Sequence, residues 1–324
     1  MLMSVLLFAV GLVLLIKGGD WFVDGATGIA KRFNLPDIVV GATVVSIGTT
    51  LPEVMVSTTG ALAGSGAMAY GNAIGSIICN TALIAAISIV VNPGPVNVKS
   101  MKTPAIFFFA SAALYCVASY VLGEFPRWMG FVMLGIFVLY TVLTVRNGMK
   151  NPDAVEEEEE EDSKPRKLWQ ELILLVIGAA VIAVGADLLV DHGQIIAIEL
   201  GVPETVVALL FVALGTSLPE LVTTITSLKK GRASLGVGNV IGANVFNLVL
   251  VSGVAVSLAP FPVPCENTLL NTGLNMSLVF EIPVMLGVMS LMIFPALLSK
   301  KLGRWQGILL LAIYAAFCVC QFML

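Results

Sequence analysis

A hexapeptide that occurs twice limits the folds open to this chain more than any other part of the sequence. Residues 48–53 read Gly-Thr-Thr-Leu-Pro-Glu, and residues 215–220 read Gly-Thr-Ser-Leu-Pro-Glu. The offset of 167 residues holds beyond the motif, since residues 71–75 (Gly-Asn-Ala-Ile-Gly) match residues 238–242 (Gly-Asn-Val-Ile-Gly) without a gap. An internal repeat of this length predicts a fold made of two equivalent halves.

The chain around this repeat is strongly apolar. Of its 324 residues, 58% are hydrophobic and 12% are charged, and the mean hydropathy is +0.98. Soluble cores are not this apolar, and runs of about twenty apolar residues can cross a bilayer as helices. The sequence therefore predicts an all-α polytopic membrane protein with ten transmembrane helices. The expected spans are residues 2–19, 36–61, 69–91, 104–122, 128–147, 168–190, 203–228, 235–258, 280–298 and 304–323.

An acidic stretch separates the fifth and sixth spans. Residues 156–162 are six glutamates followed by an aspartate, and a block of like charge of this size is expected to be a solvated linker. Five spans lie on either side of it. Because five is odd, the second half must enter the membrane from the opposite side, which predicts an inverted repeat. The expected units are a first repeat at 1–147, a linker at 148–167 and a second repeat at 168–324.

The basic residues predict the orientation of the chain. If the N-terminus is outside, 16 of the 17 lysines and arginines fall on the cytoplasmic side, and Arg127 alone falls outside. This is a strong positive-inside bias. We therefore expect a multi-pass protein of the plasma (inner) membrane with both termini extracytoplasmic and the acidic linker cytoplasmic.

Each copy of the hexapeptide places a carboxylate inside an apolar run, at Glu53 and Glu220. A charged side chain at the bilayer centre costs about 2.5 to 3.5 kcal/mol on insertion scales, so it is by default a functional-site candidate. Buried charges need partners, yet no lysine or arginine lies in the interior of an expected span. A bound cation would be the natural counter-charge. The alternative is a duplicated scaffold in which both glutamates are merely buried.

The residues before each glutamate supply further oxygen atoms. Pro52 lacks an N–H and should break the helix, leaving the carbonyls around Gly48 and Thr49 unpaired. Thr49 and Thr50 lie four and three residues before Glu53, the spacing that places side chains on one helix face. Carboxylate, hydroxyl and carbonyl oxygens are hard donors that suit Na⁺, Ca²⁺ and Mg²⁺.

Polar residues of the third and eighth spans complete the candidate site. Ser76 and Asn80 lie four residues apart, on one helix face that we expect to meet the first glutamate motif. At the repeat offset, Asn247 matches Asn80 and Ala243 matches Ser76. The two asparagines fit cation binding, although asparagine also serves as a packing device between membrane helices.

Other polar residues are expected to have structural roles. Asn72 and Asn239 lie nearer the span entrances, where packing or helix capping is the simpler interpretation. Exposed or capping positions are also expected for four aspartates at span ends, which are Asp20, Asp24, Asp187 and Asp191.

The sequence pattern distinguishes between several functional classes. The sequence has no phosphate-binding loop, nucleophile–base pair or metal-spaced Cys/His set, so we expect neither an enzyme nor an ATP-driven pump. A cation channel could use paired acidic residues as a filter, but inverted repeats with broken helices are typical of secondary transporters. A structural membrane protein would leave the unpaired glutamates unexplained.

Together, the repeated motifs resemble the two alpha-repeats of the sodium/calcium exchanger family, within the cation/Ca²⁺ antiporters, and most of all its bacterial branch. The alpha-repeats would lie at about 36–91 and 203–258. The resemblance implies antiport of Na⁺ and Ca²⁺ by alternating access, with export of Ca²⁺ expected. It implies a monomer in the lipid bilayer, no nucleic-acid partner and no cofactor beyond the transported ions. Coupling to H⁺ or K⁺ remains the nearest alternative.

The resemblance also assigns roles by position. Glu53 and Glu220 would bridge Ca²⁺, with help from the carbonyls of Thr49 and Thr216. The Na⁺ sites would draw on Thr49, Thr50, Thr216, Ser217 and Ser76, with Asn80 and Asn247 at the centre. Some exchangers carry a serine and an aspartate in the eighth span where this chain has Ala243 and Asn247. The missing hydroxyl and acid leave the number of bound Na⁺ ions open.

Overall fold

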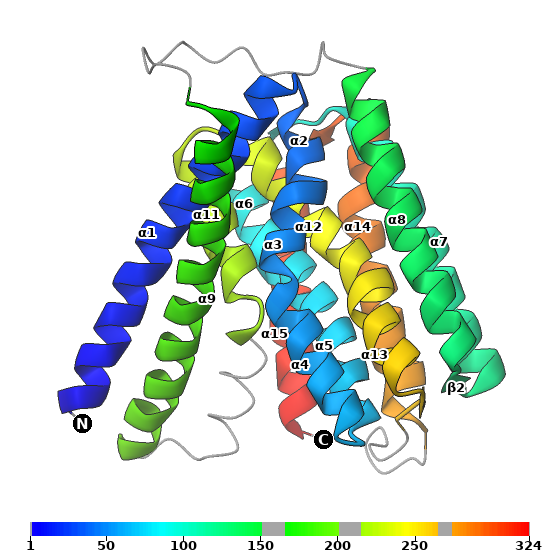
Figure 1. Ribbon diagram of the computed structural model, residues 1–324. Helices are drawn as coiled ribbons and strands as arrows, with labels where there is room; N and C mark the ends of the chain where they lie inside the picture. The colour runs from blue at the N-terminus through cyan, green and yellow to red at the C-terminus, as the bar shows by residue number, and fades with distance from the viewer. Residues whose placement is uncertain (1, 151–165, 201–214, 265–273, 324) are drawn as a thin grey trace.

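A computed structural model describes residues 2–150, 166–200, 215–264 and 274–323 of the chain, and nearly all of them lie in helices (Figure 1). The acidic run of residues 156–162 lies outside the described residues. Both chain ends lie at one end of the molecule, and α8 stops and α9 starts at the other (Figure 1). In the first half, the helices are α1 (Leu2–Arg32), α2 (Asp37–Val40), α3 (Ser46–Thr49), α4 (Leu51–Leu62), α5 (Gly66–Cys79), α6 (Ala86–Val91), α7 (Val98–Cys116) and α8 (Arg127–Met149), with π-helical turns η1 (Gly41–Val45), η2 (Asn80–Ala85) and η3 (Val117–Leu122).

The second half repeats this order. Its described helices are α9 (Leu168–Glu199), α11 (Leu218–Lys229), α12 (Ala233–Phe246), α13 (Ser252–Leu258), α14 (Ile282–Ser299) and α15 (Arg304–Met323), with π-helical turns η5 (Asn247–Val251) and η7 (Ser277–Glu281).

The helices have the length and composition of membrane spans. Among the described residues, 8 continuous helical stretches are long and apolar enough to cross a bilayer, and the bent pair Asp37–Thr49 and Leu51–Leu62 would make a ninth. The expected span at 203–228 is described only from residue 215 onward. The all-α polytopic fold class is confirmed.

The first and sixth spans are longer than predicted. The structure extends α1 to Arg32 and α9 to Glu199, giving 31 and 32 residues, about 46 to 48 Å of helix at 1.5 Å per residue. The hydrocarbon core of a bilayer is only about 30 Å thick. The aspartates at positions 20, 24, 187 and 191 therefore lie inside long helices and cap none. Asp20 and Asp24 are matched by a lysine from another helix, described below.

The two halves are inverted relative to each other. Close approaches between α1 and α9 join Gly11 to Gly185, Gly18 to Ile182, and Gly25 to Glu171. Along these contacts the residue number rises in one helix and falls in the other, so these equivalent helices run antiparallel. Figure 1 shows them side by side at one flank of the molecule. This geometry agrees with the inverted repeat that an odd number of spans per half predicts.

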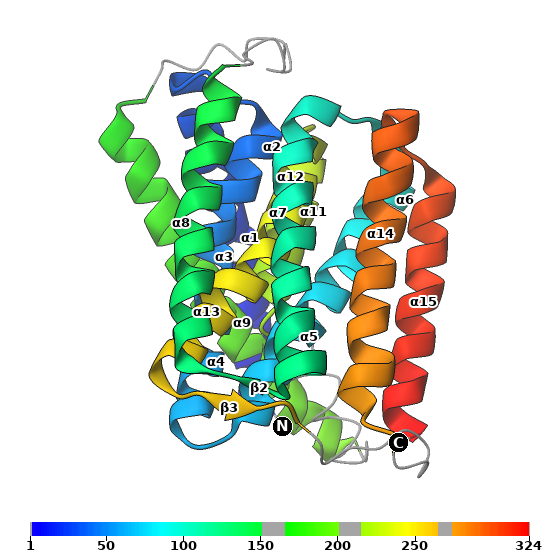
Figure 2. The same cartoon turned by 90° about the vertical axis from the view of Figure 1, so that its right-hand side faces the viewer.

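Two short strand pairs obey the same symmetry. Strand β1 (Gly94–Pro95) pairs with β4 (Lys301–Leu302), and β2 (Glu124–Phe125) pairs with β3 (Phe261–Pro262), both antiparallel. At the repeat offset β1 corresponds to β3, so the two pairs are equivalent crossed connections between the halves. Figure 2 shows β2 and β3 at the end of the molecule that also carries the chain termini.

The third and eighth spans form the core. Of the most apolar window in each, 72% is buried for Gly66–Val91 and 89% for Ala233–Leu258, against 17 to 39% for the other continuous spans. Glycine allows this close packing, since a Cβ at Gly238 would lie 2.3 Å from the Ile38 carbonyl oxygen, and one at Gly242 would lie 2.4 Å from Ser46 Oγ. The start of the second span thus packs directly on the eighth, which belongs to the other half.

Candidate cation-binding site

The first glutamate motif breaks the second span. Helix α3 ends at Thr49, Thr50 forms the junction (φ −86°, ψ −2°), and α4 begins at Leu51 after a bend of 45°. Pro52 explains the break, because it cannot donate a hydrogen bond to the carbonyl of Gly48 four residues earlier. Glu53 lies in the first turn of α4, where the positive end of the helix dipole favours a negative charge.

The second motif has the same local geometry. Ser217 occupies the junction with φ −89° and ψ 3°, and α11 begins at Leu218. Pro219 lies at the start of this helix, and Glu220 lies in its first turn. The repeated sequence therefore places two carboxylates at two equivalent helix N-termini.

Both carboxylates are completely buried. Glu53 and Glu220 are each 0% exposed, and no carboxyl oxygen of either has a hydrogen-bond partner among the described residues. The two groups lie close enough to interact electrostatically. Removing one charge from water without a partner costs several kcal/mol, and two adjacent carboxylates repel each other. The pair therefore has the properties of a site that needs positive charge.

The two motifs come together in one site. The hydroxyls of Thr49 and Thr50, from the first half, lie beside the Glu220 carboxyl of the second half. Buried oxygens of Thr50 and Ser217 have no hydrogen-bond partner among the described residues. Buried hydroxyl and carboxylate oxygens with open lone pairs thus come from both motifs, and such oxygens are the donors that Na⁺ and Ca²⁺ prefer.

Asn80 and Asn247 occupy equivalent and unusual positions. Both are 0% exposed, and the amide nitrogen and oxygen of both lack partners among the described residues. The π-helical turn η2 begins at Asn80, and η5 begins at Asn247. Single π-helical turns within α-helices frequently occur at functional sites. The sequence predicted the two asparagines but gave no sign of the π turns.

The remaining predicted site residues take different environments. Ser76 is buried on α5, one turn before Asn80, whereas its counterpart Ala243 is fully buried and contributes no oxygen. Thr216 is half-buried and donates a hydrogen bond to Asn72 Oδ1 at 3.3 Å. Thr49 is buried and donates to Asn239 Oδ1 at 3.2 Å.

Of the two roles expected for Asn72 and Asn239, packing or capping, the structure shows contacts between helices and no helix cap. Both lie inside helices, and each accepts a hydrogen bond from the hexapeptide of the opposite half. Asn72 also donates to the Glu53 carbonyl oxygen at 3.2 Å and to Ser57 Oγ at 2.8 Å. Their matching positions in the repeat are the signal from which this role could have been found.

One buried asparagine was not singled out in the sequence. Asn244 donates to Thr81 Oγ1 at 2.7 Å and to Met289 Sδ at 3.1 Å, next to the two π-helical turns. Its position in the first half is taken by Ile77, so the repeat could not reveal it.

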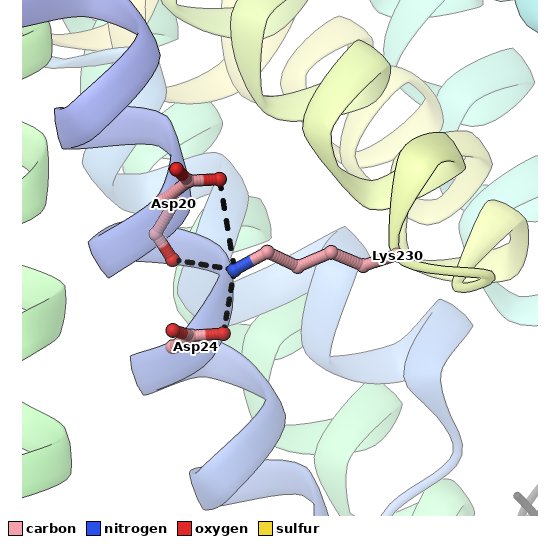
Figure 3. A network of polar contacts seen from close by, with 3 residues as sticks. All are labelled: Asp20, Asp24 and Lys230. Carbon is pink, nitrogen blue, oxygen red and sulfur yellow. Dashed lines mark hydrogen bonds and ion pairs between the residues drawn. The ribbon is translucent and has the colours of Figure 1, made fainter.

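The ion pairs found among the described residues involve neither of the two glutamates. Lys230 Nζ is 2.6 Å from Asp24 Oδ1 and 3.8 Å from Asp20 Oδ1, and it also donates to the Asp20 carbonyl oxygen at 3.0 Å (Figure 3). Arg232 forms a buried pair with Asp37, with its Nη1 at 3.0 and 2.9 Å from the two carboxylate oxygens. Within the described ranges, no cluster of three or more His, Cys, Asp or Glu side chains could hold a metal ion.

Two inverted halves, helices broken at proline, and buried oxygens gathered at the break define the class of secondary membrane transporters. A family model described as sodium/calcium exchanger protein matches residues 3–146 and 171–323, and the chain belongs to this family.

Known relatives match over nearly the full length. The chain is 35% identical over 309 residues to the uncharacterized membrane protein MJ0091 of Methanocaldococcus jannaschii, covering 95% of this chain and 94% of that protein. It is 28% identical over 352 residues to the sodium/calcium exchanger MaX1 of Methanosarcina acetivorans, covering 98% of each. A solved structure of the sodium-calcium exchanger NCX_Mj matches with a TM-score of 0.79 and 33% identity over 97% of both chains.

Proposed function

We propose that this protein is an antiporter that exchanges Na⁺ for Ca²⁺ across the plasma (inner) membrane by alternating access. The observation that carries the proposal is the pair Glu53 and Glu220, fully buried, adjacent and without a hydrogen-bond partner among the described residues. One Ca²⁺ carries the charge that neutralises both. The family and the relatives support the same pair of ions.

The ligand set follows from the positions around the two carboxylates. Glu53 and Glu220 would bridge Ca²⁺, with the carbonyls of Thr49 and Thr216 as further ligands. The Na⁺ sites would use the hydroxyls of Ser76, Thr50, Ser217, Thr49 and Thr216. Asn80 and Asn247 would bind at the centre. No cofactor is required, and K⁺ is a further ion that such an oxygen-lined site could hold.

Antiport follows from the cost of the empty site. Two bare carboxylates are too costly to enclose in the membrane, so the site should change its access only when cations occupy it. Exchange of three Na⁺ for one Ca²⁺, the usual ratio of the family, would move about one positive charge per cycle. At 100 mV this charge is worth about 2.3 kcal/mol, which favours Ca²⁺ export from a negative interior.

The two ends of the site differ in exposure, as alternating access requires. The Thr49–Asn239 pair is buried, whereas the Thr216–Asn72 pair is only part-buried. Asn72 lies in the second turn of α5, and the α4–α5 turn lies at the end of the molecule that carries both termini (Figure 1). With the basic residues on the cytoplasmic side, this more accessible end would face outward. One chain contains both halves of the site, so we propose that a monomer suffices.

The test is ⁴⁵Ca²⁺ uptake into proteoliposomes loaded with Na⁺, compared with vesicles loaded with K⁺ or given a pH gradient. We expect uptake driven by the outward Na⁺ gradient alone. Uptake that required internal K⁺ or a proton gradient would replace Na⁺/Ca²⁺ exchange by another coupling. Uptake down the Ca²⁺ gradient without any counter-ion would indicate a channel.

A further inference from the structure

The first threonine of each hexapeptide donates a hydrogen bond to an asparagine of the opposite half. Thr49 Oγ1 lies 3.2 Å from Asn239 Oδ1, and Thr216 Oγ1 lies 3.3 Å from Asn72 Oδ1. A hydroxyl has one proton and two lone pairs, so the group that takes the proton decides what the hydroxyl can offer elsewhere. These two asparagines lie outside the set of residues proposed to bind the ions.

The direction of these bonds follows from the neighbours of Asn72. Its Nδ2 lies 3.2 Å from the Glu53 carbonyl oxygen, which can only accept a hydrogen bond. The amide nitrogen must therefore face Glu53, and Oδ1 must face Thr216. Thr216 is thus the donor. Asn239 is the repeat equivalent of Asn72, and from this equivalence we assign its amide the same orientation, with Oδ1 accepting from Thr49.

The consequence is clearest at Glu220. The Thr49 hydroxyl lies beside this carboxyl, yet neither carboxyl oxygen has a hydrogen-bond partner among the described residues. Because the proton of Thr49 is directed to Asn239, the hydroxyl turns its lone pairs toward the carboxylate. Two electron-rich oxygens then face each other, and a cation between them would relieve the repulsion.

We propose that Asn239 and Asn72 are positioning residues that accept the hydroxyl protons of Thr49 and Thr216, so that these hydroxyls turn their lone pairs to a cation; for Thr49 this also keeps the proton away from Glu220. Without Asn239, the Thr49 hydroxyl would rotate and donate to Glu220, and the incoming cation would have to displace that bond. The inference rests on the proposed function, and it adds two residues that set ion affinity without contacting the ion.

Double-mutant cycles test this coupling, because the effect of each asparagine on ion affinity should pass through its own threonine. Asn239→Leu and Thr49→Val form one cycle, and Asn72→Leu and Thr216→Val form the other. The crossed pairs, Asn239 with Thr216 and Asn72 with Thr49, are matched controls in the same protein. The readouts are the Na⁺ and Ca²⁺ concentrations for half-maximal ⁴⁵Ca²⁺ exchange in proteoliposomes, and the maximal rate.

We expect Asn239→Leu to raise the half-maximal concentrations about tenfold, with a smaller change in maximal rate, because one hydrogen bond to a charged group is at stake. In the Thr49→Val background the same change should have almost no further effect. In the crossed pairs, the fold-changes of the two single variants should multiply. Should Asn239→Leu not fold, Asn239→Ser replaces it. The serine oxygen lies one bond nearer the backbone than the asparagine oxygen and should not reach Thr49.

The inference would be overturned if the fold-changes in half-maximal concentration multiplied within the Asn239–Thr49 and Asn72–Thr216 pairs. It would also be overturned if both asparagine variants left these concentrations unchanged. A wild-type chain without Na⁺-driven uptake would instead refute the proposed function itself. The two failures are therefore distinguishable in one set of vesicles.

Discussion

The turn between α4 and α5 and the turn between α11 and α12 are equivalent in the repeat but differ in charge. The second turn carries Lys230 and Arg232, which pair with aspartates of the first half, whereas the first turn has Ala63 and Ser65 at these positions. By contrast, the hexapeptide and its cross-repeat bonds are present twice. The duplicated elements build the site, and the single elements make its two ends unequal.

This difference matters for a transporter that must open at both ends. Lys230, at the end of α11, pairs with Asp20 and Asp24 of α1 (Figure 3). At the repeat offset, Asp187 and Asp191 correspond to these two aspartates, and Ala63 corresponds to the lysine. Equal halves would favour neither access state. We therefore expect the ion pairs at one end to favour one access state over the other.

The largest expected effect tests whether the two halves are equivalent at the site. Glu53→Gln and Glu220→Gln should each abolish ⁴⁵Ca²⁺ uptake, because one carboxylate alone cannot neutralise Ca²⁺. Glu281→Gln is a matched control, since this glutamate lies outside the site and accepts a hydrogen bond from Gln321 at 3.2 Å. Robust exchange in either site variant would contradict the shared site.

The second prediction concerns an element that the repeat does not duplicate. Asp37→Asn should lower the free energy of unfolding by about 3 to 5 kcal/mol, because it breaks a buried ion pair with Arg232, a residue only 7% exposed. Thermal unfolding in detergent measures the effect. Asp24→Asn is the control at a more exposed pair, where less than about 1 kcal/mol is expected. Equal losses in both variants would contradict the distinction.

The third prediction makes the two halves of the site more alike. Ala243→Ser adds a hydroxyl at the position equivalent to Ser76, and should lower the Na⁺ concentration for half-maximal exchange several-fold, for about 1 kcal/mol of added interaction. Ser76→Ala should raise this concentration. If Ser76→Ala has no effect, the Ser76 hydroxyl is not part of the site.

The smallest effect concerns the exposed ion pairs. Lys230→Met should cost less than about 1 kcal/mol of stability, and the difference from wild type should shrink at high salt, because exposed pairs are screened. Unfolding temperatures at low and high ionic strength measure it. A loss as large as that of Asp37→Asn would show that the Lys230 pair is a main structural support.

The sequence predicted the elements that depend on local chemistry. The helix break follows from Pro52, the inversion follows from five spans per half, and the burial of Glu53 and Glu220 follows from their apolar context. Each needs only the residues near it in the chain, together with the repeat offset.

Features that depend on distant partners could not be read in this way. The charge of Asp20 in the first span is compensated by Lys230, which lies 210 residues later in the chain. The role of Asn239 requires Thr49, which lies 190 residues away. The π-helical turns at Asn80 and Asn247 arise in the packed core, and no residue pattern marked them.

Equilibrium binding of ⁴⁵Ca²⁺ to the purified protein in detergent tests the central claim most directly, since it measures the site without transport. We predict about one Ca²⁺ per chain, as two carboxylates require for neutrality, displaced by Na⁺ but not by equal K⁺, and lost in Glu53→Gln and Glu220→Gln. Binding that persists in these variants, or that Na⁺ does not displace, would contradict the account.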